Sequence, residues 1–266
     1  MKSFQQITLL LLTAAACAAP ARAADASADE IVKRSLESFY YAGNSMRARV
    51  SMKLINRQGN VREREMTILR LNLGNSGDQR YYIYFHGPAD VKRTSFLIWK
   101  YPAKDDDRWI YVPTLKLVKR ISVDDKRSSF VGSDFTYEDL SGRDLEDETR
   151  VLVRKEDLAG RPTYVIESKP KTPSDYSRRL SWIDRERWLP LREEYFDARN
   201  EPLRTFTADK VEQIGGQWSV TVRSMKNLQS GHRTEVVFRE TEYGVGIKQD
   251  IFTERYLRDA PAQWVR

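Results

Sequence analysis

Apolar residues follow a helical spacing over one stretch near the N-terminus and alternate with polar residues over most of the remaining chain. Ser27 and Glu30 have the spacing of a capping box, in which the first side chain accepts a hydrogen bond at the start of a helix. Gly43 and Asn44 end the periodic stretch. The pattern therefore predicts a helix directly after Ser27, with one apolar face formed by Ile31, Val32, Leu36, Phe39 and Tyr40.

A long β-hairpin is predicted behind this helix. Side chains from Met46 to Leu54 alternate between apolar and polar, and a turn at residues 56–60 leads into a second strand at residues 61–73. The alternation changes parity between Ile68 and Leu69. A change of parity indicates a β-bulge or a sheet edge at that point.

Shorter strand-like segments follow, separated by glycine, proline, asparagine and aspartate. One helix and then strands joined mostly by tight turns predict a mainly β chain of the α+β class, with a single antiparallel meander. The strand at Phe96 to Trp99 is apolar on both faces, so it needs cover on each side, from the helix or from an insertion. The further predicted strands are residues 80–86, 95–101, 108–112, 115–122, 149–155, 163–168, 178–184, 191–197, 203–214, 217–227 and 233–243.

The meander is interrupted once, from Asp124 to Glu148, where no strand period is present and acidic residues are dense. A long insertion in a chain with otherwise tight turns is often functional. It also carries apolar side chains, so we expect it to act as a lid over one opening of the sheet, or to contact a partner, through Phe130, Phe135, Tyr137 and Leu140.

The N-terminus has the pattern of a secretory signal peptide. Lys2 precedes an apolar run at residues 7–19, and small residues stand before a predicted cleavage site after Ala23. The apolar run is shorter than the roughly 20 residues that a membrane-spanning helix needs. The sequence therefore predicts a signal peptide at residues 1–23 and one exported domain at residues 24–266.

The single cysteine, Cys17, leaves an alternative open. The residues before it loosely resemble a lipoprotein cleavage box, but Ala14 stands where a large aliphatic residue is usual. Cleavage after Ala23 fits better and leaves an exported chain without cysteine, which must be held together by its own core. Lipidation of Cys17 and anchoring in the outer membrane is the less favoured alternative.

Charge and composition exclude several classes of function. The full chain carries a net charge of +7, and removing Lys2 and Arg22 leaves 7 − 2 = +5, a modest excess that does not indicate a nucleic-acid partner. His86 and His232, at a strand end and in a turn, are expected at the surface. No nucleophile-elbow, phosphate-loop or metal-binding motif is present, so we expect neither enzyme activity nor a metal or cofactor.

The middle of the chain resembles the LolA-like outer-membrane lipoprotein-sorting proteins. The resemblance extends more weakly into the C-terminal strands. It is carried by FHGPADV at residues 85–91, TSFLIW at 94–99, DRWIYVP at 107–113, VKRI at 118–121 and, most specifically, SFVGSDFTYEDL at 129–140.

This resemblance implies a single, strongly curved antiparallel sheet that forms a half-open barrel, closed by the N-terminal helix and by the helical or loop insertion. It also implies a periplasmic carrier that moves a lipid, or the acyl chains of a lipoprotein, between envelope membranes. An inner-membrane transporter of the RND type and an outer-membrane acceptor are the implied partners. A periplasmic lipid sensor that regulates a membrane protein is the alternative function.

Alternate side chains of a curved sheet face one lumen, and flexible methionines suit a cavity with variable cargo. For any one of these apolar side chains, simple core packing remains the competing interpretation. The residues expected to line the cavity are Met46, Val50, Met52, Met66, Ile68, Phe96, Ile98, Trp109, Tyr111 and Trp182.

Overall fold

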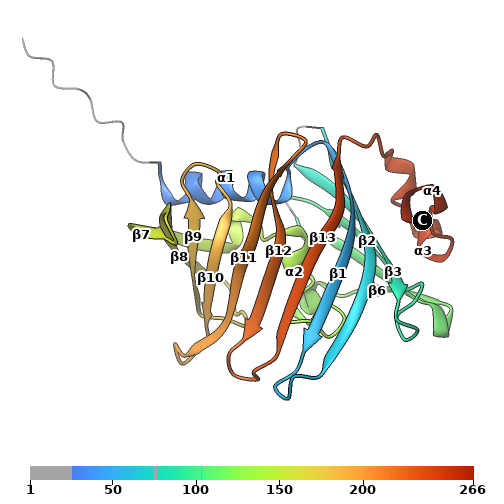
Figure 1. Ribbon diagram of the computed structural model, residues 1–266, viewed down its shortest axis with the longest axis horizontal. Helices are drawn as coiled ribbons and strands as arrows, with labels where there is room; N and C mark the ends of the chain where they lie inside the picture. Colours follow the sequence, from blue (N-terminus) through green and yellow to red (C-terminus); the bar gives the residue numbers. More distant parts are fainter. Residues whose placement is uncertain (1–25, 75–76, 103) are drawn as a thin grey trace, which may run out of the picture.

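The computed structural model describes residues 26–74, 77–102 and 104–266. The predicted signal peptide, including Cys17, lies outside these residues. Within the described part of the chain, thirteen strands form one antiparallel sheet in the order β6-β5-β4-β3-β2-β1-β13-β12-β11-β10-β9-β8-β7 (Figure 1). The strands are β1 (Ser45–Ile55), β2 (Val61–Leu73), β3 (Asp78–Gly87), β4 (Ser95–Lys100), β5 (Asp107–Val112), β6 (Leu117–Ile121), β7 (Glu148–Leu158), β8 (Arg161–Pro170), β9 (Arg178–Asp184), β10 (Pro190–Phe196), β11 (Pro202–Ile214), β12 (Gln217–Asn227) and β13 (Arg233–Tyr243).

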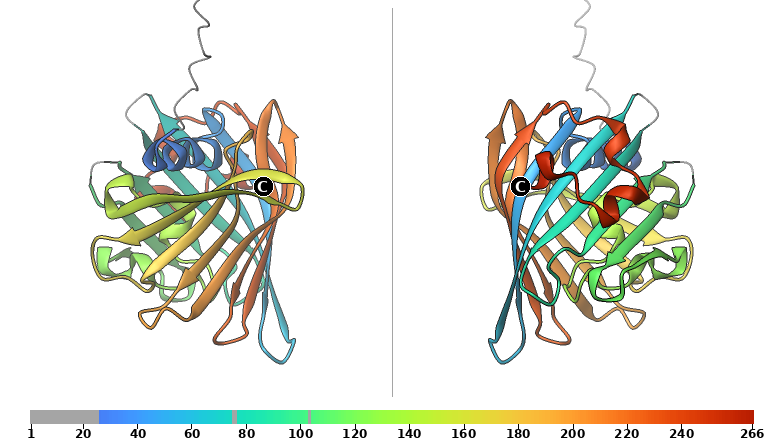
Figure 2. Two further views of the ribbon diagram at one scale, coloured as in Figure 1. Left: turned by 90° about the vertical axis from the view of Figure 1, so that its left-hand side faces the viewer. Right: turned by 90° about the vertical axis from the view of Figure 1, so that its right-hand side faces the viewer.

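The strand order is that of a circular meander opened at one place. Every neighbouring pair is consecutive in sequence except β1 and β13, which pair along most of their length. The two edges of the sheet are β6 and β7, the strands that flank the predicted insertion. The insertion thus takes the place of the pairing that would have closed the barrel, and the predicted half-open antiparallel sheet is confirmed (Figure 2).

The predicted N-terminal helix is α1 (Ala28–Tyr40). The Ser27 hydroxyl accepts a hydrogen bond from the Glu30 backbone at 3.2 Å, as the capping spacing predicts, whereas the Glu30 carboxylate pairs with Arg34 at 2.8 Å. Ile31 and Val32 are buried against side chains from the concave face of β8 and β9. The helix therefore covers part of the concave face near one edge of the sheet.

The change of parity in β2 marks neither a bulge nor a sheet edge, so that prediction is wrong. β1 and β2 pair in continuous register through Ile68 and Leu69. Ile68 packs into the core of the concave face, whereas Leu69 is buried in a second core with Tyr82 and Leu97 on the convex face. The apolar residues change parity because both faces of this strand are covered.

The second cover is the C-terminal segment, which lies outside the curve of the sheet (Figures 1 and 2). It consists of η4 (Gln249–Ile251), α3 (Glu254–Arg258) and α4 (Ala262–Val265). Phe252, Leu257 and Val265 are buried against the convex face. We call residues 249–265 the outer cover. Among the described helices, none combines the length and apolar character needed to cross a bilayer.

Candidate functional site

The concave face has an apolar half, built by β1 to β4 and β13. Alternation in β1 places Met46, Val50 and Met52 on this face, and the paired strands add further apolar side chains. The same core includes Met66, Phe85, Phe96, Phe130, Phe135, Met225 and Val236. This half of the concave face is therefore a continuous apolar surface.

Residues 123–147, which we call the lid, cover this surface. The lid contains η2 (Val123–Arg127), an isolated bridge between Ser129 and Thr136, α2 (Glu138–Ser141) and η3 (Leu145–Asp147). Phe130 is fully buried against Phe85 and Phe96, with ring centroids 6.0 and 5.1 Å away. The insertion thus packs its aromatic side chains onto the concave face.

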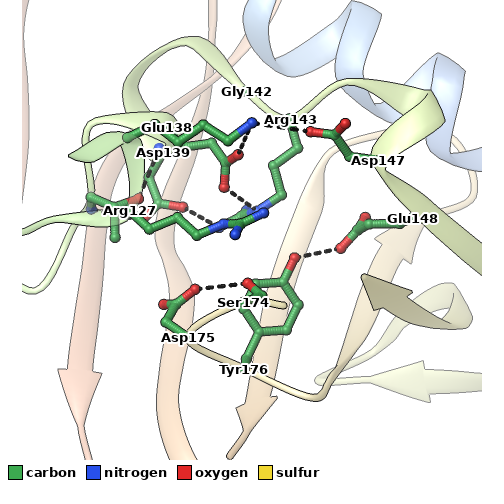
Figure 3. A network of polar contacts seen from close by, with 12 residues as sticks. Arg127, Glu138, Asp139, Gly142, Arg143, Asp147, Glu148, Ser174, Asp175 and Tyr176 are labelled. Atoms are coloured by element: carbon green, nitrogen blue, oxygen red, sulfur yellow. Dashed lines mark hydrogen bonds and ion pairs between the residues drawn. The ribbon is translucent and has the colours of Figure 1, made fainter. Parts of the chain in front are cut away.

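Ion pairs also hold the lid in place. Arg143 lies 2.9 Å from both Glu138 and Asp139 within the lid (Figure 3). Lys100 of β4 contacts Asp144 at 2.6 Å. A hydrogen bond of 2.6 Å between the His232 ring and the Asp134 carboxylate adds to these ion pairs, at the turn before β13. The acidic cluster in the sequence is therefore a set of partners for basic side chains from the lid and the sheet.

The other half of the concave face, on β7 to β11, carries buried charged side chains beside the apolar ones. Glu148 accepts a hydrogen bond from the Tyr176 hydroxyl at 2.6 Å (Figure 3) and contacts Arg179 at 2.8 Å. Arg179 also contacts Glu193 at 2.8 Å. Burial raises the pKa of Glu148, but Arg179 and Arg143 outweigh it and hold the pKa below its usual value. The Glu148 carboxylate is therefore charged at neutral pH, and it is paired.

Asp139 joins the lid to this charged half. It contacts Arg143 at 2.9 Å and Arg204 of β11 at 3.5 Å. Burial raises its pKa, but the two guanidinium groups and hydrogen bonds from Thr136 outweigh that effect and lower the pKa to about 2. A carboxylate with so low a pKa is a firmly ionised anchor for the lid.

Little empty space remains between the lid and the sheet. An open cleft of about 490 Å³ lies at the end of the lid, between α1 and residues 141–146, and no residue of the concave apolar core lines it. Three cavities of about 60, 80 and 30 Å³ lie beneath α1 and the lid, over the concave face itself. Each is far below the roughly 300 Å³ at which ligand pockets begin. In this structure the lid's own side chains therefore fill the apolar half of the concave face.

Seven of the ten side chains predicted to line the cavity lie on the concave face. Six of them belong to its apolar core: Met46, Val50, Met52, Met66, Ile68 and Phe96. Ile98, two residues beyond Phe96 on the same face of β4, is buried between its strand neighbours Tyr81 and Arg108. All four lid residues, Phe130, Phe135, Tyr137 and Leu140, pack against the same core.

The other three predicted cavity residues lie on the convex face, which corrects the prediction. Trp109 and Tyr111 pack into the core beneath the outer cover. Trp182 lies between the guanidinium groups of Arg154 and Arg192 and donates a hydrogen bond to Glu156. Large aromatic residues could not be assigned to a face because both faces carry apolar side chains.

Both histidines are partly buried rather than at the surface. Nε2 of His86 lies 2.9 Å from Arg49 and 2.9 Å from Thr67. Burial, and to a lesser extent the positive charge of Arg49, lowers the pKa of His86 to about 4. His232 pairs with Asp134 of the lid. Their partners are far away in the sequence, so no local signal could have revealed them. Within the described ranges, no group of three or more histidine, cysteine or acidic residues could hold a metal ion.

A family model with the description "uncharacterized protein" matches residues 77–259. The chain belongs to this family. Its fold is that of the LolA-like proteins, and the resemblance drawn from the sequence is confirmed. No curated protein matches the chain in sequence.

Three solved structures show the LolA-like fold. A domain from Vibrio parahaemolyticus, named for outer membrane lipoprotein sorting, is 29% identical with a TM-score of 0.80, covering 87% of this chain and 98% of that one. A DUF1329 family protein from Desulfovibrio piger is 29% identical with a TM-score of 0.77, covering 85% and 95%. A LolA superfamily protein from Nitrosomonas europaea is 19% identical with a TM-score of 0.67, covering 87% and 100%, and supports the fold alone.

Proposed function

We propose that this protein binds a lipid, or the acyl chains of a lipoprotein, between the lid and the apolar half of the concave face. It carries this cargo between the envelope membranes without covalent chemistry. The signal peptide predicted at residues 1–23 supports a periplasmic location. The similarity to a domain named for lipoprotein sorting supports the class of cargo.

The continuous apolar surface beneath a separate lid is the observation that carries this proposal. Burying one CH₂ group is worth about 0.8 kcal/mol, so a sixteen-carbon chain gains roughly 12 kcal/mol on leaving water. Met46, Met52 and Met66 lie on this surface, and their flexible side chains can adapt to acyl chains of different lengths. The surface thus has the chemistry that a lipid carrier needs.

The lid has to move for cargo to enter, because the closed cavities are too small. Lid opening separates Arg143 and Asp139 from the sheet and exposes Phe130, whose place on the apolar surface the cargo then takes. Water can solvate the separated charges, which offsets part of the lost attraction. An RND-type transporter at the inner membrane would load the carrier, and an outer-membrane acceptor would receive the cargo. Relative affinities would set the direction of transport.

Native mass spectrometry of the protein, purified gently from the periplasm of its own host, tests this proposal. We expect an adduct of lipid mass that organic extraction removes. A mass without adduct, and no uptake when lipids or lipopeptides are offered to the extracted protein, would disprove the carrier function.

Two variants with an added charge distinguish an effect on lipid binding from an effect on folding. Met52→Lys places a charge on the apolar concave surface, and Val237→Lys places one on the opposite face of β13, beside Ser51 of β1. We expect Met52→Lys to abolish lipid binding and Val237→Lys to retain it, with native strand content by circular dichroism in both. A Met52→Lys protein that folds and binds lipid like the wild type would exclude this cavity.

A further inference from the structure

Arg223 of β12 lies at the centre of the concave face. It is opposite Val236 of β13 and Ala208 of β11, two residues of the concave apolar core. Its guanidinium group lies between two aromatic rings, 5.2 Å from the centroid of Phe39 in α1 and 4.4 Å from that of Phe238 in β13. These contacts hold a positive charge among apolar groups.

Arg223 differs from the other arginines of this face in having neither an acidic partner nor a hydrogen bond to a carbonyl group. Arg143 pairs with two carboxylates of the lid, Arg179 with Glu148 and Glu193, and Arg204 with Asp139 and Asp175. Arg70 donates hydrogen bonds to backbone carbonyls at the end of α1. No ion pair or hydrogen bond joins Arg223 to any described residue, which leaves its N–H groups available to a ligand.

The space around Arg223 is where a ligand would enter. This side chain lines all three cavities beneath α1 and the lid. The cavity of about 30 Å³ is also lined by Val50, Met52 and Met66 of the apolar half. The free cation and the surface proposed for acyl chains therefore face the same space. Burial lowers the pKa of Arg223, because a charged guanidinium group loses its hydration there. An anion placed beside it would offset this desolvation cost.

Asp139 is the acidic residue whose charge acts on Arg223. Its carboxylate is already shared between Arg143 and Arg204. When the lid opens, Asp139 moves away with the lid, whereas Arg223 stays on the sheet. The open form would thus expose an unpaired guanidinium group at the border between the apolar and the charged halves.

We propose that the cargo is an anionic amphiphile, and that its phosphate or carboxylate group pairs with Arg223 while its acyl chains lie along Met52 and Met66. This inference rests on the proposed carrier function and adds the charge of the cargo to it. A guanidinium group binds phosphate and carboxylate oxygens through two parallel hydrogen bonds. Such a pair would also set the orientation of the cargo in the cavity.

Binding of three test lipids to the delipidated full-length mature protein distinguishes the possibilities. The lipids are phosphatidylglycerol, palmitate and a neutral diacylglycerol with the same acyl chains as the phosphatidylglycerol. We expect the wild type to bind at least one of the two anionic lipids about tenfold more tightly than the diacylglycerol, a difference of about 1.4 kcal/mol. The stronger of the two anionic lipids shows whether the group is a phosphate or a carboxylate.

Arg223→Met should remove this preference and leave diacylglycerol binding unchanged, because it deletes the charge and keeps an apolar side chain. Arg223→Lys should retain part of the preference, since it keeps the charge and loses the paired hydrogen bonds. Arg239→Met, which removes an exposed charge on β13, is the control for net charge and should bind like the wild type. Circular dichroism of all variants checks the fold, and Arg223→Lys serves if Arg223→Met does not fold.

Three results separate this inference from the proposed function. If the wild type binds none of the three lipids and takes up no lipopeptide, the carrier function itself is disproved; if it takes up a lipopeptide alone, the carrier function stands and the anionic cargo is wrong. If the wild type binds phosphatidylglycerol, palmitate and diacylglycerol equally, or if both Arg223 variants keep the full preference, the carrier function stands and the role of Arg223 is wrong.

Discussion

The sheet is covered on both faces, but the two covers are held by different interactions. The lid, residues 123–147, lies on the concave face and is joined to the sheet by ion pairs, among them Lys100 with Asp144 and Arg204 with Asp139. For the outer cover, residues 249–265, the structure shows no ion pair to any described residue. The two covers are thus built for different tasks.

The outer cover is held by burial and by hydrogen bonds to its backbone. Tyr82, Ser95 and Trp99 on the sheet donate to carbonyl groups of the cover at 2.7, 2.6 and 2.9 Å. Phe252 and Leu257 are each 1% exposed beneath it. Releasing this segment would expose large apolar side chains, at about 1.5–3 kcal/mol each, with no ligand to replace them.

Under the proposed carrier function, this difference indicates which cover moves. When the ion pairs of the lid separate, water can solvate the charged groups. A lipid can take the place of the lid's aromatic side chains on the sheet. The outer cover has no such substitutes, so it stabilises the curved sheet permanently. We therefore assign gating of the cavity to the lid and stability of the sheet to the outer cover.

The largest expected effect comes from replacing one fully buried phenylalanine in each cover. Phe252→Ala in the outer cover and Phe130→Ala in the lid should each lower the free energy of unfolding by about 3–5 kcal/mol, the usual cost of such a cavity. Only Phe130→Ala should also change how long lipid is retained, because only Phe130 packs on the apolar concave surface. Urea unfolding and the rate of lipid transfer to vesicles measure the two effects.

Equal loss of lipid retention in both variants would contradict the division of roles. So would unchanged retention in Phe130→Ala, provided that native strand content shows the variant to be folded.

The sequence predicted the lid but not the outer cover. The lid interrupts a regular pattern of strands and carries four apolar residues, so it is visible as an insertion. In the outer cover, α3 and α4 are five and four residues long, too short to show a helical period. The pattern of β4 does predict cover on both faces, but the helix or the insertion was expected to supply it, and the parity change in β2 was interpreted as a bulge or a sheet edge.

The strand pattern predicted most of the concave apolar surface because alternation fixes the face of each residue within a strand. It failed for Trp109 and Tyr111 because the strand around them has apolar residues of both parities, so parity alone does not tell which face is inside. The sequence also could not predict which charged side chains pair with one another. Asp134 and His232 lie 98 residues apart, and only the pairing of β1 with β13 and the path of the lid bring them together.

Asp139 provides a smaller and more specific test of the lid. Its pKa is lowered to about 2 in the folded protein, so its ionised form contributes stability that is present above its ordinary pKa of 3.8 and is lost as the pH falls toward 2. Asp139→Asn should be less stable than the wild type at pH 7. The difference should shrink by about 2 kcal/mol between pH 5 and pH 2.

Urea unfolding at several pH values measures this change. Asp90→Asn is the control, because Asp90 pairs with Arg64 outside the lid and is 62% exposed. Parallel pH profiles for the wild type and Asp139→Asn would show that Asp139 is not the ionised anchor of the lid.

His86 gives the smallest expected effect and probes the convex face in a different pH range. Its pKa is lowered to about 4 by burial and by Arg49, so the unfolded chain binds the proton more readily than the folded one. Stability therefore falls as the pH drops from about 6.5 toward 4, by about 1 kcal/mol once screening by water at this partly exposed site is considered.

His86→Gln, whose side-chain oxygen can still accept a hydrogen bond from Arg49, should lose this pH dependence and keep the lipid retention of the wild type. An unchanged slope between pH 6.5 and 4 in urea unfolding would show that His86 is solvated rather than held neutral, and a change in lipid retention would show that the convex face communicates with the cavity.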